Sequence, residues 1–404
     1  MNNPKKTSLV VFLTFLITSA MYLIAFTFVP ALSSLPRSIN NFFTGNSNSD
    51  LTQRINEIDS YLEGTYINKY DRNELNDMAV RGYVAGLGDK YSIYYTKEEF
   101  DELNAEMKGN YKGIGIEVAV DEEGYIQVLK AYKNAPAAEG GMQAQDRIVK
   151  VNETEVNGDN FDLAIDMIKG VGKYGKNDTM TITVLRGEKL LDLKITRREV
   201  VAQSVETKML PGNVGYISLS SFMEESDEDF IKGTNSLISN GAKYLIVDLR
   251  NNGGGMLDTV VNISDFLLPK GKILTIKGKE SEPVVFSSDE TCIDIPICVL
   301  INRNSASASE VLAGALKDHS KATIVGETSY GKGVVQTLYP LSDGSGVKLT
   351  TAKYYTPSGE CIDQKGIKPD KTIEMEITKA LDLYSLDEDI QLKEAMKQVK
   401  KSKK

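Results

Sequence analysis

Histidine is nearly absent from this chain. The 404 residues include one histidine, His319, and no tryptophan. A Ser–His–Asp or Cys–His catalytic centre would have to use that one residue. A zinc site would have carboxylates and scattered thiols as its remaining ligands. The shortage of histidine therefore directs the search for a catalytic base to other side chains.

Cysteine is also scarce, and acidic residues outnumber basic ones. The three cysteines, Cys292, Cys298 and Cys361, match neither a disulfide framework nor the spacing of a zinc site. The sequence leaves open whether two of them pair. The net charge is −9 and the pI is near 5.1. Because phosphate binding needs a basic face, we expect no nucleic acid among the main partners.

The N-terminal segment has the length and composition of a membrane span. Lys5 and Lys6 precede residues 7–29, which carry no charge. Such a stretch can cross a hydrocarbon core of about 30 Å, and the preceding lysines would keep the N-terminus in the cytoplasm. A cleaved signal peptide, with a cleavage site at residues 31–33, is the alternative. The span is longer than usual signal peptide cores, which favours an uncleaved anchor in residues 1–30.

Residues 31–109 are predicted to be a linker and a helical region. Residues 31–50 are rich in Ser and Asn, contain Pro36 and Gly45, and indicate a linker. In residues 51–109, Leu51, Ile55, Ile58 and Leu62 recur at three- and four-residue steps, and a second helix is expected over 74–87. Their apolar face indicates a helical arm, which would pack within the chain or form a homodimer contact.

Residues 110–198 contain short strand patterns interrupted by one helical pattern over 159–169. The segment opens with Gly113, Ile114, Gly115 and Ile116, where glycines allow backbone N–H groups to converge on a carboxylate. This order of elements resembles a PDZ domain, a β-sandwich-like fold with two helices. The resemblance implies that these four residues bind the C-terminus of a protein or peptide.

Residues 199–375 alternate between strand and helix patterns, which predicts an α/β core. Residues 376–404 are predicted to be a helical or frayed basic tail. The expected fold is therefore multidomain, α/β and α+β, with a transmembrane helix, a helical arm, a PDZ domain and an α/β core.

A serine-rich string lies between a predicted buried strand and a predicted helix. Residues 305–310 read Ser-Ala-Ser-Ala-Ser-Glu, with Ser307 in the middle. The N-terminus of a helix offers free N–H groups and a positive field, which suit an oxyanion. A serine at this position is also a common helix cap, so the string alone does not establish catalysis.

A lysine between two glycines supplies a possible base. Lys332 is flanked by Gly331 and Gly333, which allow close packing around the lysine stem. A buried ammonium loses solvation, so its pKa falls and the neutral amine can accept a proton. Gln336 would lie on the same face of a regular strand and could orient the amine.

A glycine-rich turn follows another predicted strand. Residues 248–255 read Asp-Leu-Arg-Asn-Asn-Gly-Gly-Gly. Such a turn can direct a backbone N–H toward an oxyanion, although flexible loops between strands and helices have the same composition.

Together, these segments resemble the carboxyl-terminal processing peptidases, the tail-specific proteases of family S41, over roughly residues 50–375. The resemblance implies that Ser307 is the nucleophile, Lys332 its base and Gln336 the support of that base. It also implies an oxyanion hole formed by the backbone of Ala308 and of Gly254 or Gly255. Gly253 stands where the family usually has proline.

The resulting hypothesis is a membrane-anchored serine endopeptidase with an extracytoplasmic catalytic part, similar to Gram-positive members of the family. It would need no metal or other cofactor and would cleave proteins with exposed C-termini. The alternative is a catalytically silent, membrane-anchored PDZ adaptor. The presence of both Ser307 and Lys332 argues against that alternative.

Overall fold

The computed structural model describes residues 49–108, 110–121, 123–170, 172–201, 204–377 and 381–401. The predicted membrane segment, residues 7–29, lies outside these ranges. Within them, no helix has the length and apolar character needed to cross a membrane. The chain divides into two compact units, Met1–Leu75 and Asn76–Lys404.

Two helices follow the predicted linker. Helix α3 spans Ser49–Thr65 and α4 spans Arg72–Ala85. Arg72 pairs with Asp59 and Glu63 of α3 at 3.1 and 2.7 Å. The predicted apolar residues of α3, such as Ile55 and Ile58, are exposed.

The end of the predicted helical region contains a strand as well as a helix. Strand β1 (Ile93–Tyr95) pairs antiparallel with β18 (Gly346–Tyr355), and helix α5 follows over Lys97–Met107. Thr96 and Glu99 form a reciprocal capping box that starts α5. The predicted helical region therefore includes one strand, because pairing with a distant strand decides the conformation of residues 93–95.

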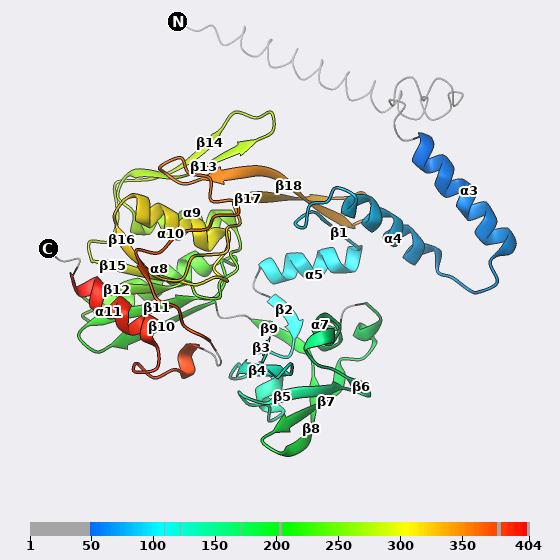
Figure 1. Cartoon of the computed structure of the whole chain (residues 1–404), viewed down its shortest axis with the longest axis horizontal. Coiled ribbons are helices and arrows are strands. Elements are labelled where there is room, and N and C mark those ends of the chain that lie inside the picture. Colours follow the sequence, from blue (N-terminus) through cyan, green and yellow to red (C-terminus); the bar gives the residue numbers. More distant parts are fainter. Residues whose placement is uncertain are drawn as a thin grey trace, which may run out of the picture. The chain divides into compact units, whose positions relative to one another are not determined.

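The PDZ domain has the predicted order of strands and helices (Figure 1). Its sheet has the order β3-β4-β5-β7-β8, with β6 beside β5, so β3 is an edge strand. The buried side chains of Ile126, Val128, Ile148 and Ile182 form the centre of its core. Its elements are β3 (Ile116–Val120), β4 (Ile126–Ala131), α6 (Pro136–Glu139), β5 (Arg147–Val151), β6 (Thr154–Glu155), α7 (Phe161–Lys169), β7 (Thr179–Arg186) and β8 (Lys189–Thr196). A short pair of strands, β2 (Asn110–Gly113) and β9 (Arg198–Val201), closes its two ends.

The second domain of the unit Asn76–Lys404 is built on a six-stranded sheet of order β10-β11-β12-β15-β16-β19. Strand β10 is antiparallel to β11, and the other pairs are parallel. The predicted α/β core is thus present, and its buried central strands explain the continuous apolar runs in the sequence. Its strands are β10 (Val205–Leu210), β11 (Val214–Leu219), β12 (Tyr244–Asp248), β15 (Ile297–Ile301), β16 (Ala322–Gly326) and β19 (Lys371–Thr372).

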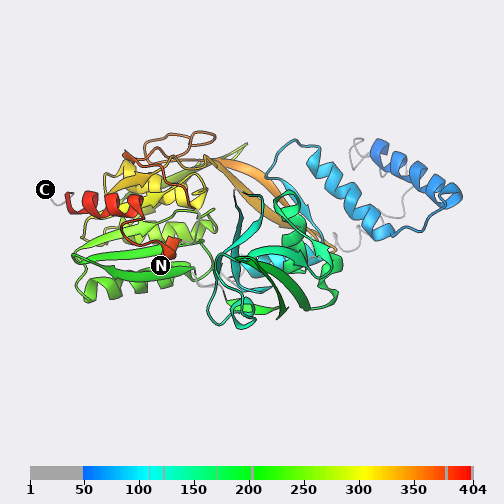
Figure 2. The same cartoon turned by 60° about the horizontal axis from the view of Figure 1, so that its bottom comes forward.

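Helices cover both faces of this sheet (Figure 2). Helices α8 (Ser226–Ser239), α9 (Leu257–Leu267) and α10 (Ala308–Asp318) pack on one face. Helix α11 (Ile390–Lys401) packs on the other face and buries Leu392 and Val399. The predicted basic tail is therefore helical and packed over 390–401, because its apolar side chains fall on one side of the helix.

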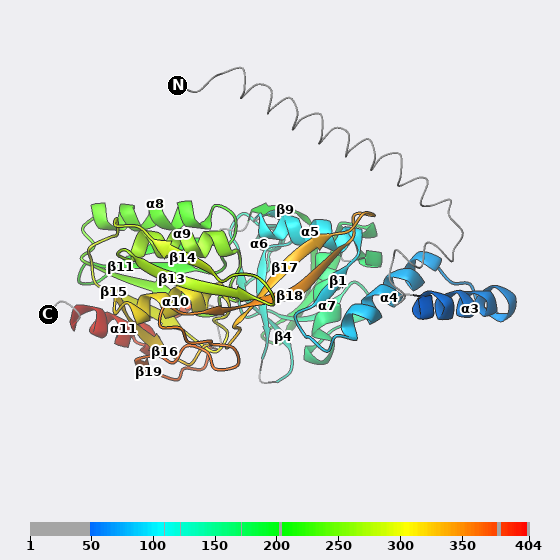
Figure 3. The same cartoon turned by 90° about the horizontal axis from the view of Figure 1, so that it is seen from above.

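An antiparallel sheet adjoins the core (Figure 3). It has the order β1-β18-β13-β14, and β17 also pairs with β18. The remaining strands are β13 (Gly271–Gly278), β14 (Val284–Ser288) and β17 (Val334–Pro340). This sheet positions the segment 331–333, which immediately precedes β17.

Candidate active site

Ser307 occupies an unusual backbone conformation at the start of α10. Its φ is 55° and its ψ is −114°, outside the regions that non-glycine residues normally adopt. Such a conformation is unfavourable and persists where surrounding structure enforces it, commonly at functional sites. Ser307 is half-buried, whereas Ala308 and Ser309 beside it are buried. The sequence string therefore presents its middle serine at the tip of a sharp strand-to-helix turn.

Glu310 joins the serine segment to the lysine segment. One carboxylate oxygen, Oε2, accepts hydrogen bonds from the backbone N–H of Ser307 at 2.9 Å and of Lys332 at 2.8 Å. The other, Oε1, accepts from the Ser329 hydroxyl and the Gly331 N–H, each at 2.6 Å. Glu310 is fully buried, so these bonds compensate its desolvation. The backbone N–H groups of Ser307 and Lys332 therefore share one acceptor atom. The structure thus brings the two residues together, as predicted.

Tyr354 makes a second link between the same two segments. Its hydroxyl donates to the carbonyl oxygen of Ser307 at 3.2 Å and also contacts the carbonyl oxygen of Lys332. Tyr354 is buried, and it belongs to β18. A helix, a loop and a β-sheet thus meet at the predicted nucleophile and base.

The surroundings of Lys332 favour its neutral form. Burial lowers the pKa of Lys332, and the nearby ammonium of Lys348 lowers it further. Tyr330 and Glu310 oppose this effect by favouring the charged form. A lysine with a lowered pKa can act as a general base near neutral pH. Within the described residues, Ser307 Oγ and Lys332 Nζ form no direct hydrogen bond.

Gln336 lies close by but contacts a different partner. Lys332 precedes β17, and the pairing of β17 with β18 shifts register between Val335 and Gln336. The prediction that Gln336 lies on the same strand face as Lys332 assumed a regular strand, and the strand is irregular at this point. The Gln336 amide donates to the hydroxyl of Thr350 at 3.3 Å. No hydrogen bond joins it to Lys332 in the described part of the chain.

The glycine-rich turn lies directly against Ser307. A Cβ added to Gly254 would fall 2.8 Å from the Cβ of Ser307 and 3.0 Å from the nitrogen of Ala308. The φ of Gly254 is +107°, which glycine tolerates and other residues rarely adopt. The Gly254 N–H, however, donates to the side chain of Asn252 at 2.8 Å. Gly254 is therefore required for close packing, and its own amide is already engaged.

The amides of Ala308 and Gly255 are better placed as free donors. Gly255 and Phe222 form a parallel β-bridge. In this bridge, the Phe222 N–H donates to the carbonyl oxygen of Gly254, and the Met256 N–H donates to the carbonyl oxygen of Phe222. The N–H of Gly255 therefore points away from Phe222. Neither this N–H nor that of Ala308 has an acceptor among the described residues. Two free N–H groups beside a serine at a helix N-terminus can bind a developing negative charge.

The predicted peptide-binding loop has a tightly packed backbone. Gly115 has a φ of +71°, and a Cβ added there would lie 2.3 Å from the Cβ of Ala135. Ile114 is buried, and its carbonyl oxygen accepts from Ala137 at 2.9 Å. Gly113 ends β2 and Ile116 begins the edge strand β3. An edge strand next to such a loop is the arrangement required for pairing with an extended peptide.

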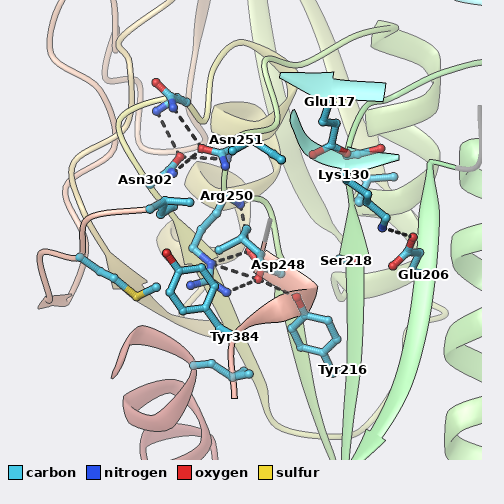
Figure 4. A pocket seen from close by; sticks show the side chains of 18 of the residues that line it. Glu117, Lys130, Glu206, Tyr216, Ser218, Asp248, Arg250, Asn251, Asn302 and Tyr384 are labelled. Atoms are coloured by element: carbon cyan, nitrogen blue, oxygen red, sulfur yellow. Dashed lines mark hydrogen bonds and ion pairs between the residues drawn. The ribbon is translucent and has the colours of Figure 1, made fainter. Parts of the chain in front are cut away.

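A cavity of about 1290 Å³ lies between the PDZ strands β3 and β4 and the core strands β10 and β11. Figure 4 shows Lys130 paired with Glu206 on one side of it, and the buried cluster of Arg250 and Asp248 on the other. Neither Ser307 nor Lys332 lines this cavity. Asn251, which precedes the glycine-rich turn, forms part of its wall.

The sequence interpretation overlooked Glu310, Tyr354 and Asn252 as parts of the site. The three-residue spacing of Ser307 and Glu310 is that of a capping box and could have indicated the first contact. Asn252 accepts the N–H of Ala306 at 3.0 Å with its carbonyl oxygen, which joins the glycine turn to the serine segment. Tyr354 had no local signal, since its partners are distant in the sequence.

This architecture, a PDZ domain beside an α/β core with a strained serine at a helix start, defines a class of protein that acts on peptide chains. A family model for peptidase family S41 matches residues 213–373, and one for the PDZ domain matches residues 113–196.

The names of similar proteins agree with this class. A probable CtpA-like serine protease of Staphylococcus aureus (strain COL) is 36% identical over 367 residues, which cover 89% of this chain and 71% of that protein. Carboxy-terminal processing protease CtpA of Bacillus subtilis (strain 168) is 33% identical over 377 residues, covering 93% and 78%. The solved structure of a photosystem II D1 C-terminal processing protease is similar, with 30% identity and a TM-score of 0.52, covering 78% of this chain and 85% of that one. The chain therefore belongs to peptidase family S41, as a serine protease of the carboxy-terminal processing type with a PDZ domain.

Proposed function

We propose that this protease cleaves peptide bonds with a Ser307–Lys332 dyad. The observation that carries the proposal is the shared carboxylate of Glu310, whose Oε2 receives the backbone N–H groups of both residues. The strained backbone of Ser307 and the lowered pKa of Lys332 support it independently.

In the proposed mechanism, Ser307 Oγ attacks the carbonyl carbon of the substrate while the neutral amine of Lys332 accepts the hydroxyl proton. The N–H groups of Ala308 and Gly255 stabilise the oxyanion. The lysine then gives the proton to the leaving amine, and water hydrolyses the acyl-enzyme by the same steps. Gln336 supports this region through Thr350 rather than through a bond to Lys332.

The PDZ domain is proposed to bind the substrate C-terminus. Residues 113–116 would bind the carboxylate, and the free edge of β3 would pair with the peptide backbone. Substrates would therefore be proteins with exposed, flexible C-termini. In a Gly115→Val variant, the new Cβ would lie 2.3 Å from the Cβ of Ala135 and would disturb the loop. This variant should raise KM for long substrates more than for short peptides.

The catalytic proposal is tested with the fragment from residue 49 and an unstructured protein such as casein. Ser307→Ala and Lys332→Ala should each abolish cleavage while circular dichroism shows an intact fold. Ser288→Ala is a matched control, because this buried serine of β14 donates to the carbonyl oxygen of Pro269 and has no proposed chemistry. Cleavage that survives in Ser307→Ala would refute the assignment. An intact wild type that never cleaves any substrate would favour the PDZ adaptor.

We also propose that residues 7–29 anchor the protease in the cell membrane, with the catalytic part outside the cytoplasm. The support is the uncharged length of this segment and the lysines before it. The full chain should remain in the membrane fraction after alkaline extraction, whereas a chain starting at residue 49 should be released.

A homodimer is proposed from the exposed Leu51, Ile55 and Ile58 of α3. Light scattering of the fragments starting at residues 49 and 76 tests this contact.

A further inference from the structure

Tyr91 contacts the catalytic lysine although it is remote from it in the sequence. The Nζ atom of Lys332 lies 5.1 Å from the centroid of the Tyr91 ring. A cation within about 6 Å of a ring face is attracted by the electron density of the ring. Tyr91 is half-buried and lies in the turn that precedes β1. The approach of an aromatic ring to the lysine is a feature that sequence motifs did not indicate.

The turn that carries Tyr91 is hydrogen-bonded to the antiparallel sheet that contains β18. The Asp89 carboxylate accepts from the Tyr91 N–H at 3.1 Å and from the Ser92 hydroxyl at 2.6 Å. The Ser92 hydroxyl accepts from the N–H of Thr350 at 3.1 Å. Thr350 is also the partner of Gln336. The position of Tyr91 is thus tied to β18 and, through Thr350, to Gln336 of β17.

A second lysine and a second tyrosine lie beside the Tyr91 ring. Lys90 Nζ donates to the Tyr330 hydroxyl at 3.0 Å. The same Nζ lies 4.8 Å from the centroid of the Tyr91 ring and 5.1 Å from that of Tyr330. Tyr330 is two residues before Lys332, so this cluster links the turn at 89–92 directly to the lysine segment.

We infer that Tyr91 is a positioning residue for the general base: the face of its ring holds the Lys332 ammonium, and Lys90 with Tyr330 holds the ring. The inference rests on the proposed role of Lys332. When Lys332 accepts the proton of Ser307, it becomes an ammonium at the ring face. The ring then stabilises a charge that is present in the transition state and absent from the neutral base, which is the condition for accelerating the step.

Other charged groups act on Lys332 from the elements around it. Lys348 of β18 and burial disfavour its charge, while Tyr330 before β17 and Glu310 of α10 favour it. The Tyr91 ring belongs with the groups that favour the charge. Its removal should therefore move the protonation of Lys332 to lower pH and should reduce the rate at high pH, where the lysine is already neutral.

The test compares Tyr91→Leu with Tyr91→Phe in the fragment from residue 49. Tyr91→Leu should shift the rising limb of kcat/KM to lower pH and lower its plateau about two- to fivefold. Tyr91→Phe keeps the ring face and should stay near the wild-type profile. Tyr355→Leu is the matched control, since it removes a ring 4.5 Å from Lys277 in the same sheet and should change neither quantity.

A second measurement separates this inference from the dyad itself. NMR titration of ¹³C-labelled lysine in a Ser307→Ala background reports the pKa of Lys332 without any turnover. The Tyr91→Leu substitution should lower that pKa, and Tyr91→Met replaces it where the leucine variant does not fold. An unchanged or raised pKa would overturn the role of Tyr91. Retained cleavage in Lys332→Ala would instead refute the dyad.

Discussion

Glu310 is a buried side chain that joins the segments of the proposed nucleophile and the proposed base. Its carboxylate accepts hydrogen bonds from Ser307, Ser329, Gly331 and Lys332. In Glu310→Gln, an NH₂ group would face N–H donors, so at least one buried donor would lose its acceptor. We expect activity to fall at least 100-fold and unfolding free energy to fall by about 2–3 kcal/mol, measured by urea denaturation.

A matched variant distinguishes the charge from the burial. Glu327 is also a buried carboxylate, but it pairs with the exposed guanidinium of Arg303. Glu327→Gln should keep its activity. Equal activities in the two glutamine variants would contradict the linking role of Glu310.

Lys348 provides a pH-dependent test at the residue scale. Its ammonium lowers the pKa of Lys332, so Lys348→Met should raise that pKa. A higher pKa leaves less neutral amine at a given pH, and the rising limb of the kcat/KM profile should therefore move to higher pH. Lys353→Met is the control, because Lys353 of the same strand pairs with Asp363. A shift to lower pH in Lys348→Met would be inconsistent with this electrostatic account.

The glycine turn acts at the scale of an element, because its backbone must fit against the start of α10. Gly254→Ala would place a Cβ 2.8 Å from that of Ser307 at a φ of +107°. We expect kcat to fall by more than 100-fold, with the fold retained by circular dichroism. Gly253→Ala has open space at its Cβ and should remain active. Comparable losses in both variants would show that flexibility, rather than close packing, explains the glycines.

Helix α11 is attached to the six-stranded sheet by a buried ion cluster. Arg250 pairs with Asp248 at 2.6 Å and with Asp389, directly before α11, at 2.8 Å. Asp389→Ala would leave the buried Arg250 guanidinium without one of its two carboxylate partners. Unfolding free energy should fall by about 3–5 kcal/mol in denaturant titration. Asp387→Ala removes an exposed carboxylate paired with Lys393 and should cost little.

At the scale of the whole molecule, Lys332, the proposed base, should reduce stability. The folded state holds the pKa of Lys332 below its ordinary value of 10.5. Below the folded-state pKa, the native site bears the full cost of a partly desolvated ammonium, and this cost disappears as pH rises through that pKa. Lys332→Met should therefore raise the unfolding free energy at pH 7, and the gain should shrink toward pH 10. Thermal unfolding across this pH range measures it. A variant less stable than wild type at pH 7 would contradict the prediction.

The sequence by itself determined the local elements and the chemical types of the site. The buried strand patterns, the helix starts and the glycine-flanked Lys332 are local signals, because periodicity and capping depend on near neighbours. The scarcity of histidine is a property of composition alone, and it likewise indicated a serine and a lysine as candidate catalytic residues. The PDZ and S41 resemblances rest on several such motifs in order.

Only the tertiary structure decided which groups meet. The register shift before Gln336, the engaged amide of Gly254 and the approach of Tyr91 to Lys332 depend on strand pairing and loop packing. The same is true of β1, whose three residues form a strand because β18 lies beside them. Such contacts join residues far apart in the chain, and no local pattern encodes the partner of a side chain at that separation.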